Sequence, residues 1–240
     1  MSFGAEVHVN HELAAREARE SRRRLAALAL HFPLKILGYL EFSEIYSIGL
    51  DRLPPPRRLD SGYTIDQANA DDIDYICREL VRDEPPAVIR NLFAEGHHCF
   101  VARSEGRIVA YDWLALSTVQ EEEYRIELEP VHAFCLNAYT VPEHRGRGVH
   151  YALLRQMLEF ATQNGRSKAY TLVSLYNRNS WKSHIRMGWV REFTYCYFRP
   201  YFTLRRIPWP LTPPRYPARL DWHRHSWFAA PPNQQISATG

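Results

Sequence analysis

Apolar and polar positions alternate in blocks from residue 63 onward, and these blocks predict strands and helices in turn. The clearest block is 148–163, where Leu153, Leu154, Met157, Leu158 and Ala161 fall on one face at helical spacing before Asn164-Gly165 ends the pattern. The predicted helices are 71–81, 87–93, 148–163 and 180–187, and the predicted strands are 63–68, 99–103, 107–116, 126–141, 169–173 and 189–198.

Two connections decide how these strands pair. Ser104-Glu105-Gly106 separates two apolar runs by a tight turn, which predicts an antiparallel hairpin. The strand, helix and strand of 134–173 need a crossover connection and therefore a parallel pair. We expect an α/β (α+β) fold with a mixed, mostly antiparallel sheet flanked by helices.

The two ends of the chain differ from this alternating middle. Residues 11–30 predict a helix, 39–50 a strand, and Pro54-Pro55-Pro56 a stiff linker. The last stretch is basic and rich in proline, which argues against regular structure, and in tryptophan, which argues against a free chain. We therefore predict an N-terminal helical and extended segment (1–61), a central domain (62–199) and a basic, aromatic tail (200–240). We expect the tail, with Trp209, Trp222 and Trp227, to wrap on the domain to about Phe228 and then to fray.

Composition excludes several classes of protein. Hydrophobic residues make up 45% of the 240-residue chain and charged residues 24%, so the chain can bury a core. A net charge of +3 is too small to indicate nucleic-acid binding. The longest apolar stretch, 25–40, is interrupted by His31, Pro33 and Lys35 and is too short for a membrane span. The arginine-rich helix beside it leaves peripheral membrane contact open, although packing on the domain is the commoner case.

The cysteines and histidines do not form a metal-binding pattern. The four cysteines have no ligand-like spacing and lie among apolar neighbours: Cys77, Cys99, Cys135 and Cys196. They predict buried thiols in a reducing, cytoplasmic compartment. His97-His98 and His223-x-His225 have no carboxylate or cysteine arranged with them, so we expect no metal.

Residues 139–154 predict a strand, a tight turn and the start of the longest helix. Free N–H groups at a helix start form an anion site, which Gly146 and Gly148 would let a ligand approach and Arg145 and Arg147 would make more positive. A diphosphate fits this description, while a purely structural glycine turn remains the alternative. The sequence matches neither a P-loop nor the dinucleotide-binding glycine pattern.

Two motifs carry a resemblance to a known family. Arg145-x-x-Gly148, followed by Ala152-Leu153-Leu154, resembles the Q/R-x-x-G-x-G/A signature of the GNAT superfamily of acyl-CoA-dependent N-acyltransferases. The segment from Asn177 through Ser180 and His184 to Gly188-Trp189 resembles a second segment of that family. The resemblance covers about 63–198 and implies a GNAT-like sheet whose central parallel strands splay apart, here after Val141.

The resemblance implies how coenzyme A would bind. Amides of 145–151 would hold its pyrophosphate, the strand at 138–140 would pair with the pantetheine arm, and the thioester would enter between that strand and 169–173. Asn177 would hydrogen-bond the arm. The implied coenzyme-binding residues are Ala138, Tyr139, Thr140, Arg145, Gly146, Arg147, Gly148, Val149, His150, Tyr151, Asn177 and Ser180. His150 replaces a small residue of the family motif, so we expect its imidazole beside the phosphates.

The catalytic groups are less firmly indicated. A main-chain N–H near Tyr139 would polarise the acyl carbonyl. His184 stands where the family often has the tyrosine that protonates the leaving thiolate, and histidine can serve as that acid. A partly exposed structural histidine is the alternative, with Tyr176 and Tyr139 as other donors. The candidate bases for the acceptor amine are Glu127, Glu129 and His132, of which we select Glu129.

The sequence therefore predicts an N-acyltransferase that moves an acetyl or other short acyl group from acetyl-CoA to a small-molecule amine. One alternative is a coenzyme A-binding regulatory module without turnover, and another is transfer of a longer acyl chain near a membrane. The sequence does not identify the acceptor or the acyl chain length. It does not determine the oligomeric state either, although a dimer is compatible with it.

Overall fold

The computed structural model describes residues 14–15, 17–19, 21–22, 25, 29, 38–51, 53–57, 59–60, 62–80, 85–120, 125–200, 207–210 and 219–221. These residues divide into two compact units, which we describe separately. The core unit comprises 47–119 and 128–172, and the terminal unit comprises 1–46, 120–127 and 173–240.

The core unit is built on a mixed sheet with strand order β8-β7-β4-β3-β2. Its strands are β2 (Tyr63–Gln67), β3 (His98–Ser104), β4 (Arg107–Ala115), β7 (His132–Thr140) and β8 (Lys168–Ser174, whose last two residues belong to the terminal unit). The pairs β2–β3, β3–β4 and β4–β7 are antiparallel, and β7–β8 is parallel. This arrangement confirms the mixed, mostly antiparallel sheet and the parallel crossover.

The hairpin between β3 and β4 turns as the sequence predicts. Glu105 and Gly106 both have positive φ, at 51° and 76°. Two such residues form the turn whose twist matches that of the flanking strands, and glycine adopts this conformation at little steric cost.

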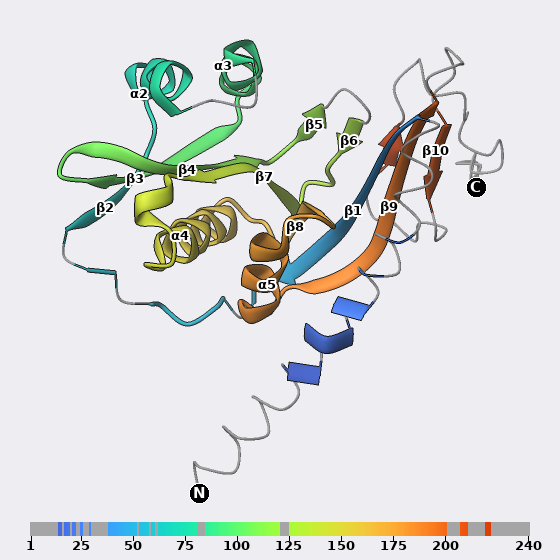
Figure 1. Cartoon of the computed structure of the whole chain (residues 1–240). Coiled ribbons are helices and arrows are strands. Elements are labelled where there is room, and N and C mark those ends of the chain that lie inside the picture. The colour runs from blue at the N-terminus through green and yellow to red at the C-terminus, as the bar shows by residue number, and fades with distance from the viewer. Residues whose placement is uncertain are drawn as a thin grey trace, which may run out of the picture. The chain divides into compact units, whose positions relative to one another are not determined.

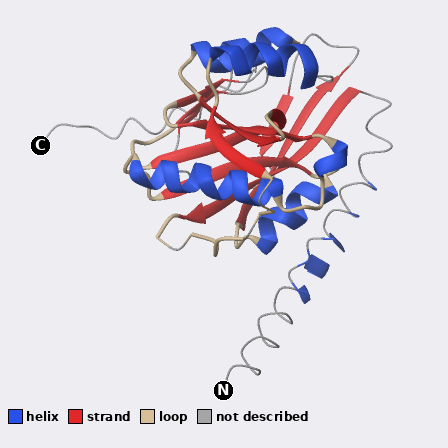
Figure 2. Cartoon of the chain, turned by 90° about the vertical axis from the view of Figure 1, so that its left-hand side faces the viewer, coloured by secondary structure: helices blue, strands red, loops and turns tan. Residues whose placement is uncertain are grey.

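Helices cover both faces of the core sheet. Helix α2 (Ala70–Tyr75), its continuation as a π-helical turn (Ile76–Leu80), and α3 (Pro86–Ala94) lie on one face, with α4 (Val149–Gln163) on the other (Figure 1). Figure 2, turned by 90°, shows the same two layers above and below the strands. The apolar face predicted for α4 is buried: Leu153, Leu154, Met157, Leu158 and Ala161.

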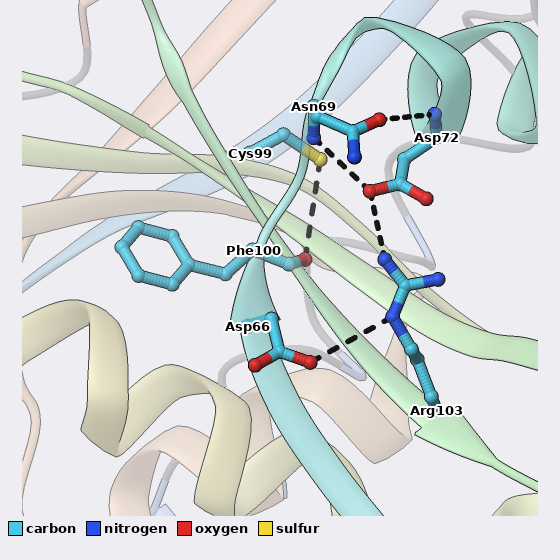
Figure 3. Close-up of polar contacts among 6 residues, drawn as sticks. All are labelled: Asp66, Asn69, Asp72, Cys99, Phe100 and Arg103. Atoms are coloured by element: carbon cyan, nitrogen blue, oxygen red, sulfur yellow. Dashed lines mark hydrogen bonds and ion pairs between the residues drawn. The ribbon is translucent and has the colours of Figure 1, made fainter. Parts of the chain in front are cut away.

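A polar network fixes the start of α2 to the sheet (Figure 3). Asn69 accepts from the Asp72 N–H at 3.0 Å, and the Asp72 carboxylate accepts from the Asn69 N–H at 3.0 Å, forming a capping box. Arg103 on β3 donates to Asp72 at 2.7 Å and lies 3.7 Å from Asp66 on β2. The network joins α2, β2 and β3 on the face of the sheet opposite α4.

The long strand predicted over 126–141 is broken near Pro130, as expected. Its parts are β6 (Arg125–Glu127) and β7, with a turn over 128–131 between them. Arg166 donates to the carbonyl oxygens of Pro130 and Leu116, which ties this turn to the end of β4. A short strand β5 (Thr118–Gln120) precedes the break.

The terminal unit contains β1 (Gly38–Gly49, whose last three residues belong to the core unit), α5 (Arg178–Arg186), β9 (Val190–Pro200), β10 (Ile207–Pro210) and β11 (Arg219–Asp221). Strands run in the order β10-β9-β1, and β11 pairs with β6. Strand β1 confirms the strand predicted over 39–50.

The prediction that the tail lacks regular structure is wrong for β10 and β11. Residues 207–210 pair antiparallel with 195–198 of β9. Pro208 and Pro210 are tolerated because β10 is the end strand in its described order, where a missing N–H donor need not break a ladder. The predicted wrapping of Trp222, Trp227 and Phe228 lies outside the described residues.

Two further predictions concern the ends and the cysteines. The described positions between 14 and 29 are helical, as predicted, and Glu17 accepts from Arg186 at 3.0 Å. Cys77, Cys99 and Cys135 are buried and free, which confirms buried thiols at these three positions. Within the described part of the chain, no helix is long and apolar enough to cross a membrane.

Candidate active site

The parallel strands β7 and β8 are paired along only the first half of β7. Their paired positions run from His132–Lys168 to Cys135–Thr171 and stop there, although β7 continues to Thr140 and β8 to Ser174. The separation therefore begins at Leu136, earlier than the point after Val141 that the sequence suggested.

A β-bulge explains the early separation. Leu136 pairs with Trp113 and Tyr139 with Tyr111, so Asn137 and Ala138 together oppose the single residue Asp112 on β4. Asn137 has a φ of 54°, a left-handed conformation that asparagine tolerates better than most residues. A bulge bends its strand, which turns β7 away from β8. Beyond Cys135 the described residues show no further pairing between β7 and β8, and Ala138 is exposed.

The turn after β7 supplies N–H groups for an anion. A short 3₁₀ helix (Pro142–His144) leads into Gly146 and Gly148, which have φ of 76° and 82°. Gly148 is the N-cap of α4, and no side chain of the described residues caps the helix there. The first turn of a helix has N–H groups without acceptors inside the helix, and the helix dipole makes this end positive. The turn thus has the chemistry that a phosphate needs.

Two side chains brace this turn instead of facing a ligand. Arg145 donates from Nε to the Thr140 carbonyl at 2.9 Å, and its guanidinium carbon lies 5.8 Å from the centre of the Tyr139 ring. His144 shares a 2.8 Å hydrogen bond between its Nδ1 and the hydroxyl of Tyr63 on β2. The sequence predicted charge from Arg145 at the phosphates, whereas the structure folds its guanidinium back onto β7.

His150 differs from its expected orientation. Its Nδ1 lies 3.7 Å from Oδ2 of Asp112 on β4, so the imidazole points toward the sheet. Burial lowers the pKa of His150 to about 4, so this side chain is neutral at pH 7 and adds no positive charge at the turn. Asp112 is 2% exposed, and this burial raises its pKa well above the usual value. The hydrogen bond that its carboxyl accepts from the Trp113 N–H lowers the pKa, but this is the smaller effect.

Glu129 lies at the other end of β7. It sits in the turn before the strand, where its carbonyl accepts from the His132 N–H at 2.9 Å and its carboxylate lies 3.8 Å from His132 Nδ1. This is the end at which β7 and β8 are still paired. At about 3.3 Å per strand residue, the nine residues of β7 separate Glu129 from the turn by roughly 25 Å or more. The placement argues against Glu129 as the base.

The second motif forms the start of α5 in the terminal unit. The Asn177 side-chain oxygen accepts a hydrogen bond from the Ser180 N–H at 3.0 Å and so caps the helix. Any hydrogen bond that Asn177 donates to a ligand must therefore come from its side-chain N–H₂ group. The same turn holds His184, whose Nδ1 lies 2.8 Å from the Ser180 carbonyl and 3.4 Å from the Ser180 hydroxyl.

His184 is buried, which rules out the alternative of a partly exposed helix histidine. It is 4% exposed, with its ring centre 5.2 Å from Trp189 and 6.4 Å from Tyr46 on β1. A carbonyl can only accept, so the contact with Ser180 places the proton of neutral His184 on Nδ1 and leaves Nε2 as the basic nitrogen. Tyr176, an alternative donor, is 42% exposed.

The predicted residues therefore fall into two groups. The core unit collects Ala138 to Tyr151 around the bulge and the turn, and the terminal unit collects Asn177, Ser180 and His184. Sequence reasoning missed Asp112 and also Arg57, whose Cδ and Nε lie 3.5 Å from the position of a Cβ built on Gly148. A lone carboxylate inside the apolar run 108–115 was a usable signal for Asp112, whereas nothing in the sequence connects Arg57 with the turn. Among the described residues no group of three or more histidines, cysteines or carboxylates could hold a metal ion.

Comparisons with known proteins identify the same region. The family model described as "Acetyltransferase (GNAT) family" matches residues 65–189. No curated protein matches the sequence.

Solved structures show the same fold at low identity. A Drosophila protein shares 11% identity at a TM-score of 0.52, covering 74% of this chain and 56% of that one. A GCN5-related N-acetyltransferase from Sphaerobacter thermophilus shares 16% at 0.51, covering 73% and 56%. The glucosamine N-acetyltransferase region of a fungal multi-domain β-N-acetylglucosaminidase shares 15% at 0.51, covering 73% and 22%. The chain thus spans little more than half of the first two proteins and less of the third.

Proposed function

Because this chain belongs to the acetyltransferase (GNAT) family, we propose that it transfers an acetyl or other short acyl group from acetyl-CoA to the amine of a small molecule. The observation that carries the proposal is the opened β7–β8 pair, which leads directly into the glycine turn at the start of α4. Acetyl-CoA is the co-substrate of this family, and the residues of the core unit suit it.

The fit to acetyl-CoA has two parts. A diphosphate matches the uncapped N-terminus of α4, where a Cβ on Gly146 or Gly148 would be strained at positive φ. The pantetheine arm carries two amides, and the edge of β7 over 138–140 offers backbone groups with which an extended chain can pair. Val149 is buried and Tyr151 half-buried, so these two contribute through their backbone N–H groups.

The reaction is a direct transfer. When bound, acetyl-CoA supplies an activated acyl carbon; the neutral acceptor amine attacks it, the new C–N bond forms and the C–S bond breaks. The amine loses one proton and the departing thiolate gains one. A main-chain N–H of the 138–140 segment would stabilise the negative charge that develops on the acyl oxygen. Holding both reactants in line would supply much of the remaining rate.

We assign the proton transfer to the thiolate to His184, on the strength of its position in the second motif. Since its Nδ1–H is held by the Ser180 carbonyl, Nε2 starts without a proton; it would take up the proton that the acceptor amine loses and pass it to the departing thiolate. Asn177 would donate from its side-chain N–H₂ to the pantetheine arm. Glu129 is left out of the proposed machinery because of its place at the closed end of β7.

Two coarser assignments complete the proposal. The acceptor is a small-molecule amine, as is usual for the family, and its structure is not specified by any motif in the chain. We also propose a reducing, cytoplasmic compartment, which the three buried free cysteines support.

Thiol release tests the proposed activity. The protein is incubated with acetyl-CoA and a panel of amines that includes amino acids, amino sugars and polyamines, while free thiol is recorded. We expect amine-dependent thiol release with at least one acceptor class. Coenzyme A binding without release by any acceptor would contradict turnover and favour the regulatory module.

A further inference from the structure

We propose that Arg57 is an additional ligand of the coenzyme diphosphate, presented by a strap formed by residues 53–57. This inference rests on the proposed coenzyme A site and extends it to a segment that lies outside both family motifs. The strap belongs to the core unit, as do β7, the glycine turn and α4.

The strap is fixed to the helix that carries the turn. The Tyr151 hydroxyl on the first turn of α4 donates to the Pro55 carbonyl at 2.7 Å. Pro54 is buried, and three consecutive prolines restrict the strap to an extended conformation. The stretch that the sequence predicted to be a linker therefore runs along the start of α4.

Arg57 follows the prolines and lies against the N-cap of α4. A Cβ built on Gly148 would lie 3.5 Å from Cδ and Nε of Arg57 and 3.8 Å from its Cζ. The guanidinium is therefore close to the uncapped N–H groups. A cation next to the positive end of a helix is unfavourable by itself, and an anion between them would reverse the sign of the interaction.

The other basic side chains of the turn leave a place for Arg57. Arg145 is turned back to the Thr140 carbonyl and the Tyr139 ring, and His150 is neutral and points toward Asp112. Arg147 and Arg57 are both exposed, and so can reach a bound anion. A planar guanidinium presents paired N–H donors that match two oxygens of a phosphate group.

Calorimetric titration with three ligands tests the assignment. Coenzyme A, dephospho-coenzyme A (which lacks the 3′-phosphate) and pantetheine (which lacks the diphosphate) are titrated into wild type, Arg57→Gln, Arg57→Lys and Tyr151→Phe. Arg78→Gln is the matched control, because Arg78 is an exposed arginine on the π-helical turn, across the sheet from α4.

We expect Arg57→Gln to weaken both diphosphate ligands equally, by about tenfold, as loss of a charge-assisted hydrogen bond would. Pantetheine binding should be the same in Arg57→Gln and wild type. Arg57→Lys should retain part of the affinity, and Tyr151→Phe should lose a smaller factor because it frees the strap. Arg78→Gln should bind like wild type.

Three results would overturn the assignment. Unchanged or tighter coenzyme A binding by Arg57→Gln would show that Arg57 does not bind the coenzyme or that it obstructs the site. A loss of affinity for coenzyme A but not for dephospho-coenzyme A would show that Arg57 binds the 3′-phosphate instead of the diphosphate. Failure of wild type itself to bind coenzyme A would instead contradict the proposed function.

Discussion

Cys135 and Thr171 form the last pair of the parallel β7–β8 ladder, and every residue proposed for coenzyme binding on β7 lies beyond that pair. Up to this point the two strands satisfy each other's backbone groups. Beyond it the bulge at Asn137 and Ala138 turns β7 away, and the backbone groups of 138–140 can serve a ligand. The position of the last pair separates the closed, structural half of the strand from the open half.

Gly148→Asp should abolish measurable coenzyme A binding, because it places a negative charge and a side chain where phosphate would lie. The backbone strain of a non-glycine residue at φ 82° should also cost about 1–2 kcal/mol of stability. Gly165→Asp is the matched control, since Gly165 has a φ of 75° just beyond the opposite end of α4. Calorimetry should show lost coenzyme A binding for Gly148→Asp but not for Gly165→Asp. Equal affinities of the two variants would show that the diphosphate does not bind at this turn.

His184→Phe should lower the chemical rate by about 10²-fold or more, the usual loss when a proton-transfer group is removed, with coenzyme A affinity nearly unchanged. Single-turnover kinetics give the rate, and a titration gives the affinity. The pH–rate profile should also lose one limb. A wild-type rate would move the acid to Tyr176, Tyr139 or water.

Glu129→Gln should leave the acetyl-transfer rate within about twofold of wild type, because Glu129 lies at the paired end of β7 and contacts His132. An initial-rate assay at saturating acetyl-CoA measures this. A loss of two orders of magnitude would restore Glu129 as the base and contradict the placement drawn from the β7–β8 register.

Asp112→Asn should stabilise the protein increasingly as the pH rises. The pKa of Asp112 is raised above its unfolded value of 3.8, so its contribution is full below that value and is lost as pH rises through the folded pKa. The pKa of His150 is lowered to about 4 from 6.5, so it contributes the opposite slope between those two values. Between pH 6.5 and 8 the His150 slope is absent, and the buried thiols of Cys77, Cys99 and Cys135, whose pKa values are raised by burial from 9.0, contribute little.

Thermal unfolding of Asp112→Asn and wild type from pH 6.5 to 8 therefore tests Asp112. We expect Asp112→Asn to gain about 1–2 kcal/mol over wild type toward the upper end, the scale on which a buried polar group costs stability. The asparagine can still accept from the Trp113 N–H that Asp112 accepts at 2.9 Å. A difference that does not vary with pH would show that Asp112 is ionised throughout this range.

Local patterns were sufficient to predict most of the fold. The apolar face of α4, the glycine turn and the β3–β4 hairpin each follow from residues close together in the chain, and the structure confirms them. The strands of the tail were missed because β10 depends on pairing with β9, a contact that the prolines obscure locally. Tertiary pairing outweighed local preference there.

The site was predictable only where the backbone itself is the ligand. Gly146 and Gly148 are typical of a turn with positive φ, so the turn could be predicted from the sequence. The direction of a side chain depends on distant segments: Thr140 and Tyr139 turn Arg145 back, and Asp112 attracts His150. Arg57 reaches the turn through a bond between Tyr151 and Pro55, 96 positions apart in sequence, which no local pattern reveals.

Amide hydrogen exchange with and without coenzyme A tests the central claim most directly. The account predicts new protection at Ala138–Thr140 and at 146–151 when coenzyme A binds, with no change at 132–135, where β7 already pairs with β8. Bound coenzyme A that protects neither the open half of β7 nor the start of α4 would contradict it.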